Sequence, residues 1–249
     1  MATLRVHDST EYWKKTDLMV KPASYPIATG YDVPSVDTIH RPLTLDLSEV
    51  SHEDRVYWAV RRAQDILLSS LALVALSPLL LITYAAIWID SPDANPIFTQ
   101  QRVGRNGKLF MMYKFRTMYV NAEENGPSLS SEDDLRVTPF GRIMRKYRLD
   151  ELPQFWNVLK GDMSLVGPRP ERKYFIDEIV KTAPYYYLLH NVRPGITSLG
   201  MVKYGYAASV DKMVERMEYD ILYYENMSLT LDLTILIYTV KTVITGKGV

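Results

Sequence analysis

An uncharged apolar run from Ile66 to Ile89, ILLSSLALVALSPLLLITYAAIWI, constrains this chain more than any other feature. As one helix it would reach about 36 Å, enough to cross a hydrocarbon core of roughly 30 Å. Pro78 lies near its middle, where proline removes a backbone donor and bends a helix, and Ser77 beside it can bond a freed carbonyl. The run therefore predicts either a kinked spanning helix or a helix broken at Ser77-Pro78 that enters one leaflet and returns.

The basic residues on the two sides of this run are equal in number. Three precede it and three follow it: Arg55, Arg61, Arg62, Arg102, Arg105 and Lys108. Because the side richer in Lys and Arg stays in the cytoplasm, equal flanks favour a segment with both ends on one side. Charge and kink together leave the spanning and the re-entrant structures open.

Composition excludes several classes of function. Lys and Arg together number 29, as do Asp and Glu, so the near-zero net charge does not indicate a nucleic-acid partner. The absence of cysteine excludes disulfides, thiolate metal sites and a cysteine nucleophile. Residues 1–54 scatter prolines among small and polar residues without a lasting period, which predicts an extended tail and no signal peptide.

A β-hairpin is predicted after the apolar run, because Asn106-Gly107 is a type I′ turn signal. Alternation along the returning strand places Lys114 and Arg116 on the same face. An arginine fork beside a lysine point charge suits a diphosphate. A basic edge that faces solvent or lipid headgroups is the other interpretation.

Thr138-Pro139 predicts the start of a helix that carries several cations. Arg142 and Arg145 share a face of this helix, as do Arg142 and Lys146, and Arg148 follows. Like charges this close cost a few tenths of a kcal/mol unless an anion offsets them. A phosphate or an anionic lipid surface would do so.

The adjacent pair Asp150-Glu151 follows directly. Since Pro153 is tolerated only in a first helical turn, a helix is predicted to begin near Asp150, and Gly161 is predicted to end it as a C-cap residue. One interpretation is that Asp150 caps this helix and Glu151 complements its dipole. The other is chemical, because paired carboxylates among cations suit Mg²⁺ with substrate phosphates, and a carboxylate can attack a phosphoryl centre.

Two later segments complete the pattern. Arg169 lies between Pro168 and Pro170, so its backbone is largely preset, which suits recognition of a diphosphate or nucleotide. In the last predicted helix, apolar residues recur at helical spacing, and internal packing is favoured over membrane contact. These residues are Leu229, Leu233, Ile237, Val240 and Ile244.

The stretches KFRTM, RLDELPQFWNVLKGDMSLVGPRPE and RPGITS, with the long C-terminal segment, resemble the bacterial sugar transferase family. The resemblance covers roughly residues 55–249, and the block from Asp-Glu-Leu-Pro-Gln to Pro-Arg-Pro is highly specific. Its members are monotopic polyprenyl-phosphate glycosyl-1-phosphate transferases. The family's re-entrant helix bends at a Ser-Pro pair, so the resemblance favours the re-entrant structure here.

The resemblance also implies roles for particular residues. It implies Asp150 as the nucleophile and Glu151 as its partner in Mg²⁺ binding and proton handling. It implies that Arg145 and Arg169 hold phosphate, with Lys114 and Arg116 as a further basic pair. Pro168, Pro170 and Arg193 complete the predicted substrate-binding set. After Arg-Pro-Gly-Ile-Thr the sequence continues SLGMVKYGYA, which departs from the family's frequent Gly-Leu-Ala-Gln-Val and leaves the sugar unspecified.

The expected fold is mainly α with a small β-hairpin. It comprises a proline-rich tail (1–54), a re-entrant membrane helix (55–90) and an interfacial catalytic domain (91–249). The expected reaction moves a sugar-1-phosphate from a UDP-sugar to undecaprenyl phosphate and releases UMP, with Mg²⁺ as cofactor. The expected location is the cytoplasmic face of the bacterial inner membrane. A nucleotide-sugar or lipid-phosphate hydrolase and a non-catalytic membrane scaffold are the alternatives.

Overall fold

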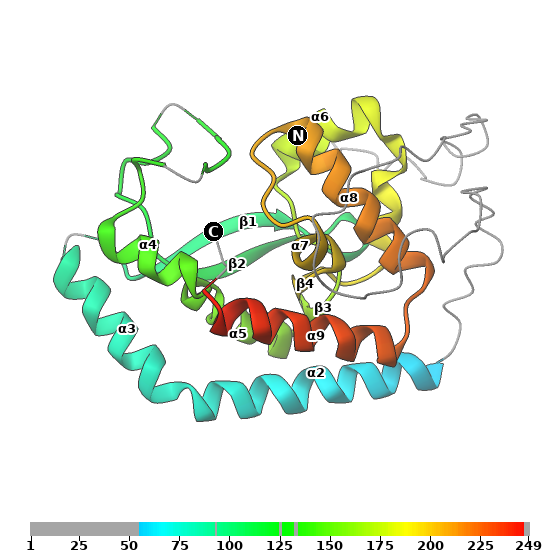
Figure 1. The fold of residues 1–249 in the computed structure, drawn as a ribbon, viewed down its shortest axis with the longest axis horizontal. Coiled ribbons are helices and arrows are strands. Elements are labelled where there is room, and N and C mark those ends of the chain that lie inside the picture. Colours follow the sequence, from blue (N-terminus) through cyan, green and yellow to red (C-terminus); the bar gives the residue numbers. More distant parts are fainter. Residues whose placement is uncertain (1–54, 93, 125, 132–133, 247–249) are drawn as a thin grey trace, which may run out of the picture. The chain divides into compact units, whose positions relative to one another are not determined.

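The apolar run lies in two helices, α2 (Arg55–Ala75) and α3 (Ser77–Asp90), which bend by 61° at the break between them (Figure 1). Pro78 lies in the first turn of α3, and the Ser77 hydroxyl donates to the Val74 carbonyl at 2.8 Å. Among the described residues no single helix is long and apolar enough to cross a membrane, whereas the bent pair together meets that criterion by length and composition. The break was predicted; the return through one leaflet stays a prediction.

The chain is described here from a computed structural model, which covers residues 55–92, 94–124, 126–131 and 134–246. The predicted tail, 1–54, lies outside the described residues. The described part is mainly helical, as predicted, and belongs to one compact unit.

Helix α2 joins this unit through polar side chains. The buried Arg61 guanidinium donates to the Tyr223 hydroxyl at 2.8 Å and lies 3.2 Å from the Asp232 carboxylate. The buried Asp65 carboxylate accepts hydrogen bonds from the Ser164 hydroxyl and the Leu165 N–H. Because Arg61 is an internal partner of the fold, the count of flanking cations carries less weight than the sequence suggested.

The predicted hairpin is confirmed. Strands β1 (Ile97–Val103) and β2 (Leu109–Phe115) pair antiparallel, with Ile97 opposite Phe115. Asn106 and Gly107 adopt positive φ angles of 57° and 71°, as the turn signal required. The connection is nevertheless longer than a two-residue turn, because a 3₁₀ turn, η2 (Arg105–Gly107), lies between the strands.

The predicted cap residue at the start of one helix and the predicted glycine at the end of another are confirmed. The Thr138 hydroxyl caps α4 (Pro139–Lys146) by accepting from the Gly141 N–H at 2.9 Å. Gly161, at φ 88°, ends α5 (Gln154–Lys160) in the left-handed conformation that glycine favours. Between α4 and α5 lies a 3₁₀ turn, η3 (Leu149–Glu151), so α5 begins at Gln154 and not near Asp150 as predicted.

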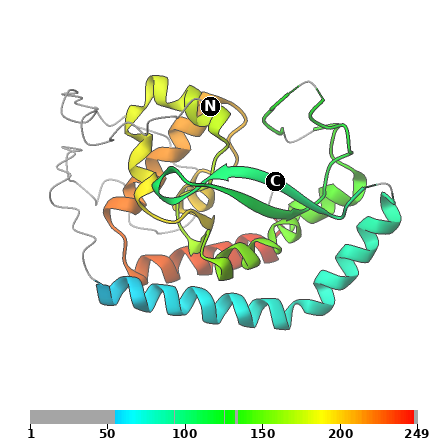
Figure 2. The same ribbon diagram turned by 180° about the vertical axis from the view of Figure 1, so that it is seen from behind.

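The second half of the chain adds a short parallel pair of strands, β3 (Ser164–Val166) and β4 (Gly195–Thr197), which was not predicted. Three-residue strands are too short to show a period of two. The remaining elements are α6 (Lys173–Thr182), η4 (Pro184–Asn191), α7 (Leu199–Lys203), α8 (Val210–Glu225) and α9 (Leu229–Ile244). Figure 2 shows the hairpin from the opposite side, in front of these elements.

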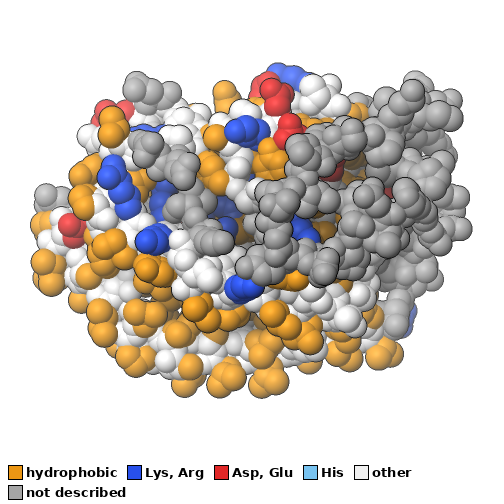
Figure 3. All heavy atoms as spheres, in the orientation of Figure 1, with side chains coloured by type: hydrophobic (Ala, Val, Ile, Leu, Met, Phe, Trp, Pro, Cys, Tyr) orange, Lys and Arg blue, Asp and Glu red, His pale blue; other side chains and the backbone are white. Residues whose placement is uncertain are grey.

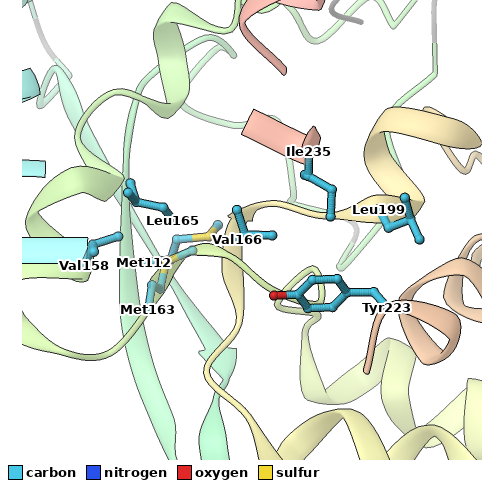
Figure 4. Packing of buried hydrophobic residues seen from close by; sticks show 8 residues of the cluster. All are labelled: Met112, Val158, Met163, Leu165, Val166, Leu199, Tyr223 and Ile235. Carbon is cyan, nitrogen blue, oxygen red and sulfur yellow. The ribbon is translucent and has the colours of Figure 1, made fainter. Parts of the chain in front are cut away.

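The main hydrophobic core collects side chains from β2, α5, β3, α7, α8 and α9 (Figure 4). Its buried members are Met112, Val158, Met163, Leu165, Val166, Leu199, Tyr223 and Ile235. The hairpin, the β3–β4 pair and the C-terminal helices are thereby fixed against one another, and the loops that carry the site project from this core.

The prediction of internal packing is wrong for most of the α9 stripe. Helix α9 packs through Asp232 and Ile235, which are buried. The four residues Leu233, Ile237, Val240 and Ile244 lie on its exposed side. Hydrophobic side chains are also exposed along α2 and α3, and they crowd the lower edge of the surface in Figure 3.

Candidate active site

A cavity of about 260 Å³ opens where β2, η3 and the loop after β3 converge. Its lining is strongly basic: eight Lys or Arg side chains face four carboxylates, a local excess of four positive charges in a chain of zero net charge. The cations are Arg102, Lys114, Arg116, Arg145, Arg148, Arg169, Arg172 and Arg216, and the carboxylates are Glu123, Asp150, Glu151 and Glu171. Such a cavity attracts phosphate groups.

Asp150 lies in this cavity with a free carboxylate. It belongs to η3, and Arg148 before it adopts a left-handed φ of 52°, which turns the chain sharply after α4. Its side chain is buried, yet no residue in the described part of the chain gives it a hydrogen bond or ion pair. Burial raises the pKa of the Asp150 carboxyl, and Lys114 opposes that shift. Asp150 therefore does not cap α5, whose N-terminal flanking residue is Pro153.

Glu151 has the opposite environment. Its carboxylate lies 3.1 Å from the Lys114 ammonium, 3.3 Å from the Arg148 guanidinium and 3.6 Å from that of Arg169. Burial alone would raise its pKa, but these three cations hold the pKa of Glu151 well below its usual range. Two adjacent carboxylates thus differ: Glu151 is ionised and enclosed by cations, and Asp150 remains available.

Arg169 reaches the cavity from a fixed loop. Its N–H donates to the Asp220 carboxylate at 3.3 Å, and its guanidinium donates to the Met201 sulfur at 3.0 Å. Pro168 and Pro170 do not line the cavity; their carbonyls accept bonds from Gly195 and Arg102 at 2.9 Å each. The prolines therefore hold the loop, and the arginine alone faces the site.

The other predicted residues divide into two groups. Arg145 lines the cavity and donates to the Thr117 hydroxyl at 3.0 Å and to the Ser130 hydroxyl at 2.7 Å. Arg116 lines it as well, just beyond the end of β2, with its Nε bound to the Asn95 carbonyl at 2.9 Å. Arg193 is not among the lining residues, because its Nε donates to the Gly161 carbonyl at 2.9 Å. A direct role for Arg193 in substrate binding has no geometric support in the described structure.

Sequence reasoning missed a second charged group. The buried Glu171 carboxylate accepts from Arg216 of α8 at 2.6 Å and from Arg102 of β1 at 3.2 Å. Arg169 lies 4.0 Å from Glu171 and so links the two carboxylate groups. Glu171 directly follows the Pro-Arg-Pro turn and was visible as a candidate, but its two partners come from distant segments.

The cavity fits Mg²⁺ only in part. The described residues contain no group of three or more His, Asp or Glu side chains placed to hold a metal. The oxygens of Glu151 are occupied by cations, whereas those of Asp150 have no partner in the part of the chain that the structure describes. Because Mg²⁺ is often held by one or two carboxylates plus substrate phosphates, Asp150 is the residue that fits as its protein ligand.

Comparison with known proteins gives a consistent match. The model of the family described as "Bacterial sugar transferase" matches residues 56–246. The chain is 45% identical over 193 residues to the UDP-N-acetylgalactosamine-undecaprenyl-phosphate N-acetylgalactosaminephosphotransferase of Aeromonas hydrophila, covering 78% of this chain and 45% of that protein. It is 41% identical over 182 residues to the UDP-glucose:undecaprenyl-phosphate glucose-1-phosphate transferase of Klebsiella pneumoniae, covering 72% of this chain and 39% of that protein. The chain thus spans less than half the length of these two relatives.

Proposed function

Because this chain belongs to the bacterial sugar transferase family, we propose that it transfers a sugar-1-phosphate from a UDP-sugar to undecaprenyl phosphate and releases UMP. The names of the two relatives support this reaction class over hydrolysis, since both are named as phosphotransferases that act on undecaprenyl phosphate. The proposed place of the reaction is the first membrane step in the assembly of an exopolysaccharide, an O-antigen or another glycan.

One observation supports the proposal: a buried carboxylate, Asp150, has no hydrogen-bond or ion-pair partner among the described residues, in a cavity that is otherwise rich in cations. A structural carboxylate in such a place would pair with a neighbouring arginine, as Glu151 and Glu171 do. A carboxylate kept unpaired and poorly solvated is a better nucleophile toward phosphorus. Asp150 therefore has the properties of a group that reacts with the substrate.

The reaction proceeds in two displacements. An Asp150 oxygen attacks the β-phosphorus of the donor, the bond from that phosphorus to the bridging oxygen breaks, and UMP leaves with the electron pair. A phosphate oxygen of undecaprenyl phosphate then attacks the same phosphorus, the Asp150–phosphorus bond breaks, and the carboxylate is regenerated. Each step needs positive charge beside the departing oxygen.

Lys114 and Arg169 supply that charge in the proposed reaction, since both line the cavity and lie beside Glu151. Glu151 orients these cations, and its low pKa keeps it ionised through the reaction. The Asp150 oxygen that does not attack could help to hold Mg²⁺, which would supply further charge neutralisation at the diphosphate. The role of Glu151 is therefore to hold the phosphate-binding side chains in place rather than to move a proton.

The proposal places α2 and α3 in the cytoplasmic membrane as a re-entrant pair, with the cavity on the cytoplasmic face. Exposed apolar side chains along both helices support it, among them Leu71, Val74, Leu81 and Ile89. The sharp bend supports it as well, because a 61° deviation is large for a helix that crosses a bilayer. A catalytic site fixed to such a pair stays near the lipid headgroups, where the acceptor phosphate lies.

The reaction class is tested by assaying the purified full-length chain with UDP-sugars and Mg²⁺, with and without undecaprenyl phosphate. A transferase gives sustained UMP release only with the lipid, and a lipid-linked sugar phosphate accumulates in equal amount. A hydrolase gives sustained release of UMP and free sugar-1-phosphate without the lipid, and that outcome would replace the proposal.

A further inference from the structure

The cavity has a second side that differs chemically from the charged one. Residues 117–120, 128–130 and 205–207 all line it, and every one of them is uncharged. We call these residues the neutral wall. Hydroxyl groups of Thr117, Ser128, Ser130 and Tyr206 lie within it, among apolar side chains such as Met118 and Leu129. The wall residues carry no charge of their own, and the guanidinium groups of Arg145 and Arg136 that contact them are already engaged in hydrogen bonds to them. The wall therefore suits an uncharged part of the substrate that carries hydroxyl groups.

Ser130 is fixed by three side chains, and Arg136 binds the Ser128 hydroxyl and the Leu129 carbonyl beside it. The Ser130 hydroxyl donates to the Asp134 carboxylate at 2.9 Å. The Tyr206 hydroxyl donates to the Ser130 carbonyl, and the Arg145 guanidinium donates to the Ser130 hydroxyl at 2.7 Å. Arg145 also holds the Thr117 hydroxyl and is close enough to Asp150 to stabilise its charge. The segment around Ser130 is therefore attached to the end of the cavity where Asp150 lies.

We propose that the neutral wall binds the sugar of the donor and that Tyr206 positions this wall through the Ser130 carbonyl. The inference rests on the proposed function, because the phosphorus attacked by Asp150 is the one that bears the sugar. The sugar must then lie beside Asp150, where Arg145 and Ser130 meet. Hydrogen bonding to individual hydroxyls is how a site distinguishes sugars that differ at one carbon, so the position of Ser130 sets the sugar preference.

The chain offers a matched control two residues away. Tyr204 lies in the same turn after α7, but its hydroxyl donates to the Glu215 carboxylate of α8 at 2.6 Å. Tyr204 does not line the cavity. Replacing Tyr204 or Tyr206 by Phe removes one hydroxyl and one hydrogen bond in each case. Only Tyr206→Phe releases the neutral wall.

The test measures kcat/KM for UMP release from UDP-glucose, UDP-galactose, UDP-N-acetylglucosamine and UDP-N-acetylgalactosamine, using the full-length chain with undecaprenyl phosphate. In Tyr206→Phe the ratio between the preferred sugar and its C4 epimer should fall about five-fold, the effect expected for one hydrogen bond. The inhibition constant of UMP should stay unchanged, because UMP contains no transferred sugar. Tyr204→Phe should change neither the ratio between the two sugars nor the inhibition constant of UMP. Ser130→Ala, which removes the hydrogen bonds to Arg145 and Asp134 but keeps the carbonyl that Tyr206 binds, should lower the same ratio.

Three results would overturn the inference. An equal loss with all four sugars would mean that Tyr206 only supports the fold. A changed inhibition constant for UMP would assign the neutral wall to the nucleoside. Unchanged kinetics in both Tyr206→Phe and Ser130→Ala would show that the wall contacts no substrate. If the wild-type chain releases UMP from none of the four donors, the proposed function itself fails and the sugar assignment fails with it.

Discussion

Asp150 and Glu151 are adjacent, yet the fold shifts the pKa values of their carboxyl groups in opposite directions. The pKa of the Asp150 carboxyl is higher in the folded chain than in the unfolded chain, where it is ~4. Ionised Asp150 therefore destabilises the fold above the folded-state pKa, and this destabilisation is absent below pH ~4. The lowered pKa of Glu151 means that its ionised form contributes stability above the unfolded pKa, which is lost as the pH falls through the folded value.

Neutralising each residue should therefore have opposite effects on Tm near neutral pH. Asp150→Asn should keep or raise Tm, with the advantage lost below pH ~4. Glu151→Gln should lower the stability by about 3–5 kcal/mol, because Lys114, Arg148 and Arg169 lose their shared counter-charge. Thermal unfolding across the pH range measures both, with Asp177→Asn on the exposed side of α6 as the control. A loss of stability in Asp150→Asn as large as that in Glu151→Gln would contradict this assignment.

The second prediction about a single residue is that the planar, two-pronged guanidinium of Arg169 is needed for catalysis. Lysine at this position keeps the charge but cannot contact Glu151, Glu171 and a phosphate in one plane. Arg169→Lys should reduce kcat/KM on the order of 100-fold, the usual loss for one transition-state donor. Arg142→Lys makes the same exchange at an exposed position of α4 and should leave the kinetics unchanged. Wild-type kinetics in Arg169→Lys would assign Arg169 to the structure of the loop alone.

Among the secondary-structure elements, the bent pair α2 and α3 is held to the rest of the fold by polar residues of α2. Arg61 and Asp65 of α2 contact β3, α8 and α9, and β3 leads directly into the loop of Arg169. The depth at which α2 lies in a bilayer would thus fix the distance of the cavity from the membrane surface. A re-entrant pair requires the residues before α2 and those after α3 to lie on the same side of the membrane.

Single cysteines test this topology cleanly, because the chain contains none of its own. Arg55→Cys lies at the start of α2, and Lys108→Cys lies in the exposed connection of the hairpin. In intact cells an impermeant thiol reagent should label neither site, and after lysis it should label both. Labelling of one site alone in intact cells would establish a crossing helix and overturn the re-entrant structure.

Short-range signals in the sequence were sufficient for the hairpin, the cap at Thr138 and the helix end at Gly161. They left Asp150, Glu151 and Arg169 open between a structural and a chemical role, and the family resemblance singled these residues out. They could not separate the environments of the two carboxylates, because Lys114 comes from β2 and is 37 residues away. The partners of Glu171 are farther still, at 69 residues for Arg102 and 45 for Arg216. The α9 stripe was misassigned because periodicity finds an apolar face but does not say what covers it.

At the scale of the molecule, a basic cavity lies in a chain whose charges otherwise balance. The local excess of positive charge attracts a charged donor, while the exposed apolar side chains of α2 and α3 suit the bilayer that holds the acceptor. In the reaction that we propose, a covalent intermediate on Asp150 separates the two encounters, because UMP would leave before the lipid phosphate reacts.

The proposed covalent sugar-phosphate intermediate on Asp150 can be trapped on the protein. The full-length chain is mixed with Mg²⁺ and a UDP-sugar labelled in its β-phosphate, without lipid, and quenched in acid. The proposed reaction predicts one burst of UMP per active site and label on the peptide that contains Asp150. Hydroxylamine should release this label from the peptide. Asp150→Asn should carry no label, while Asp177→Asn should be labelled like the wild type. UMP release that depends wholly on undecaprenyl phosphate, with no labelled protein at any time, would instead establish a single direct displacement.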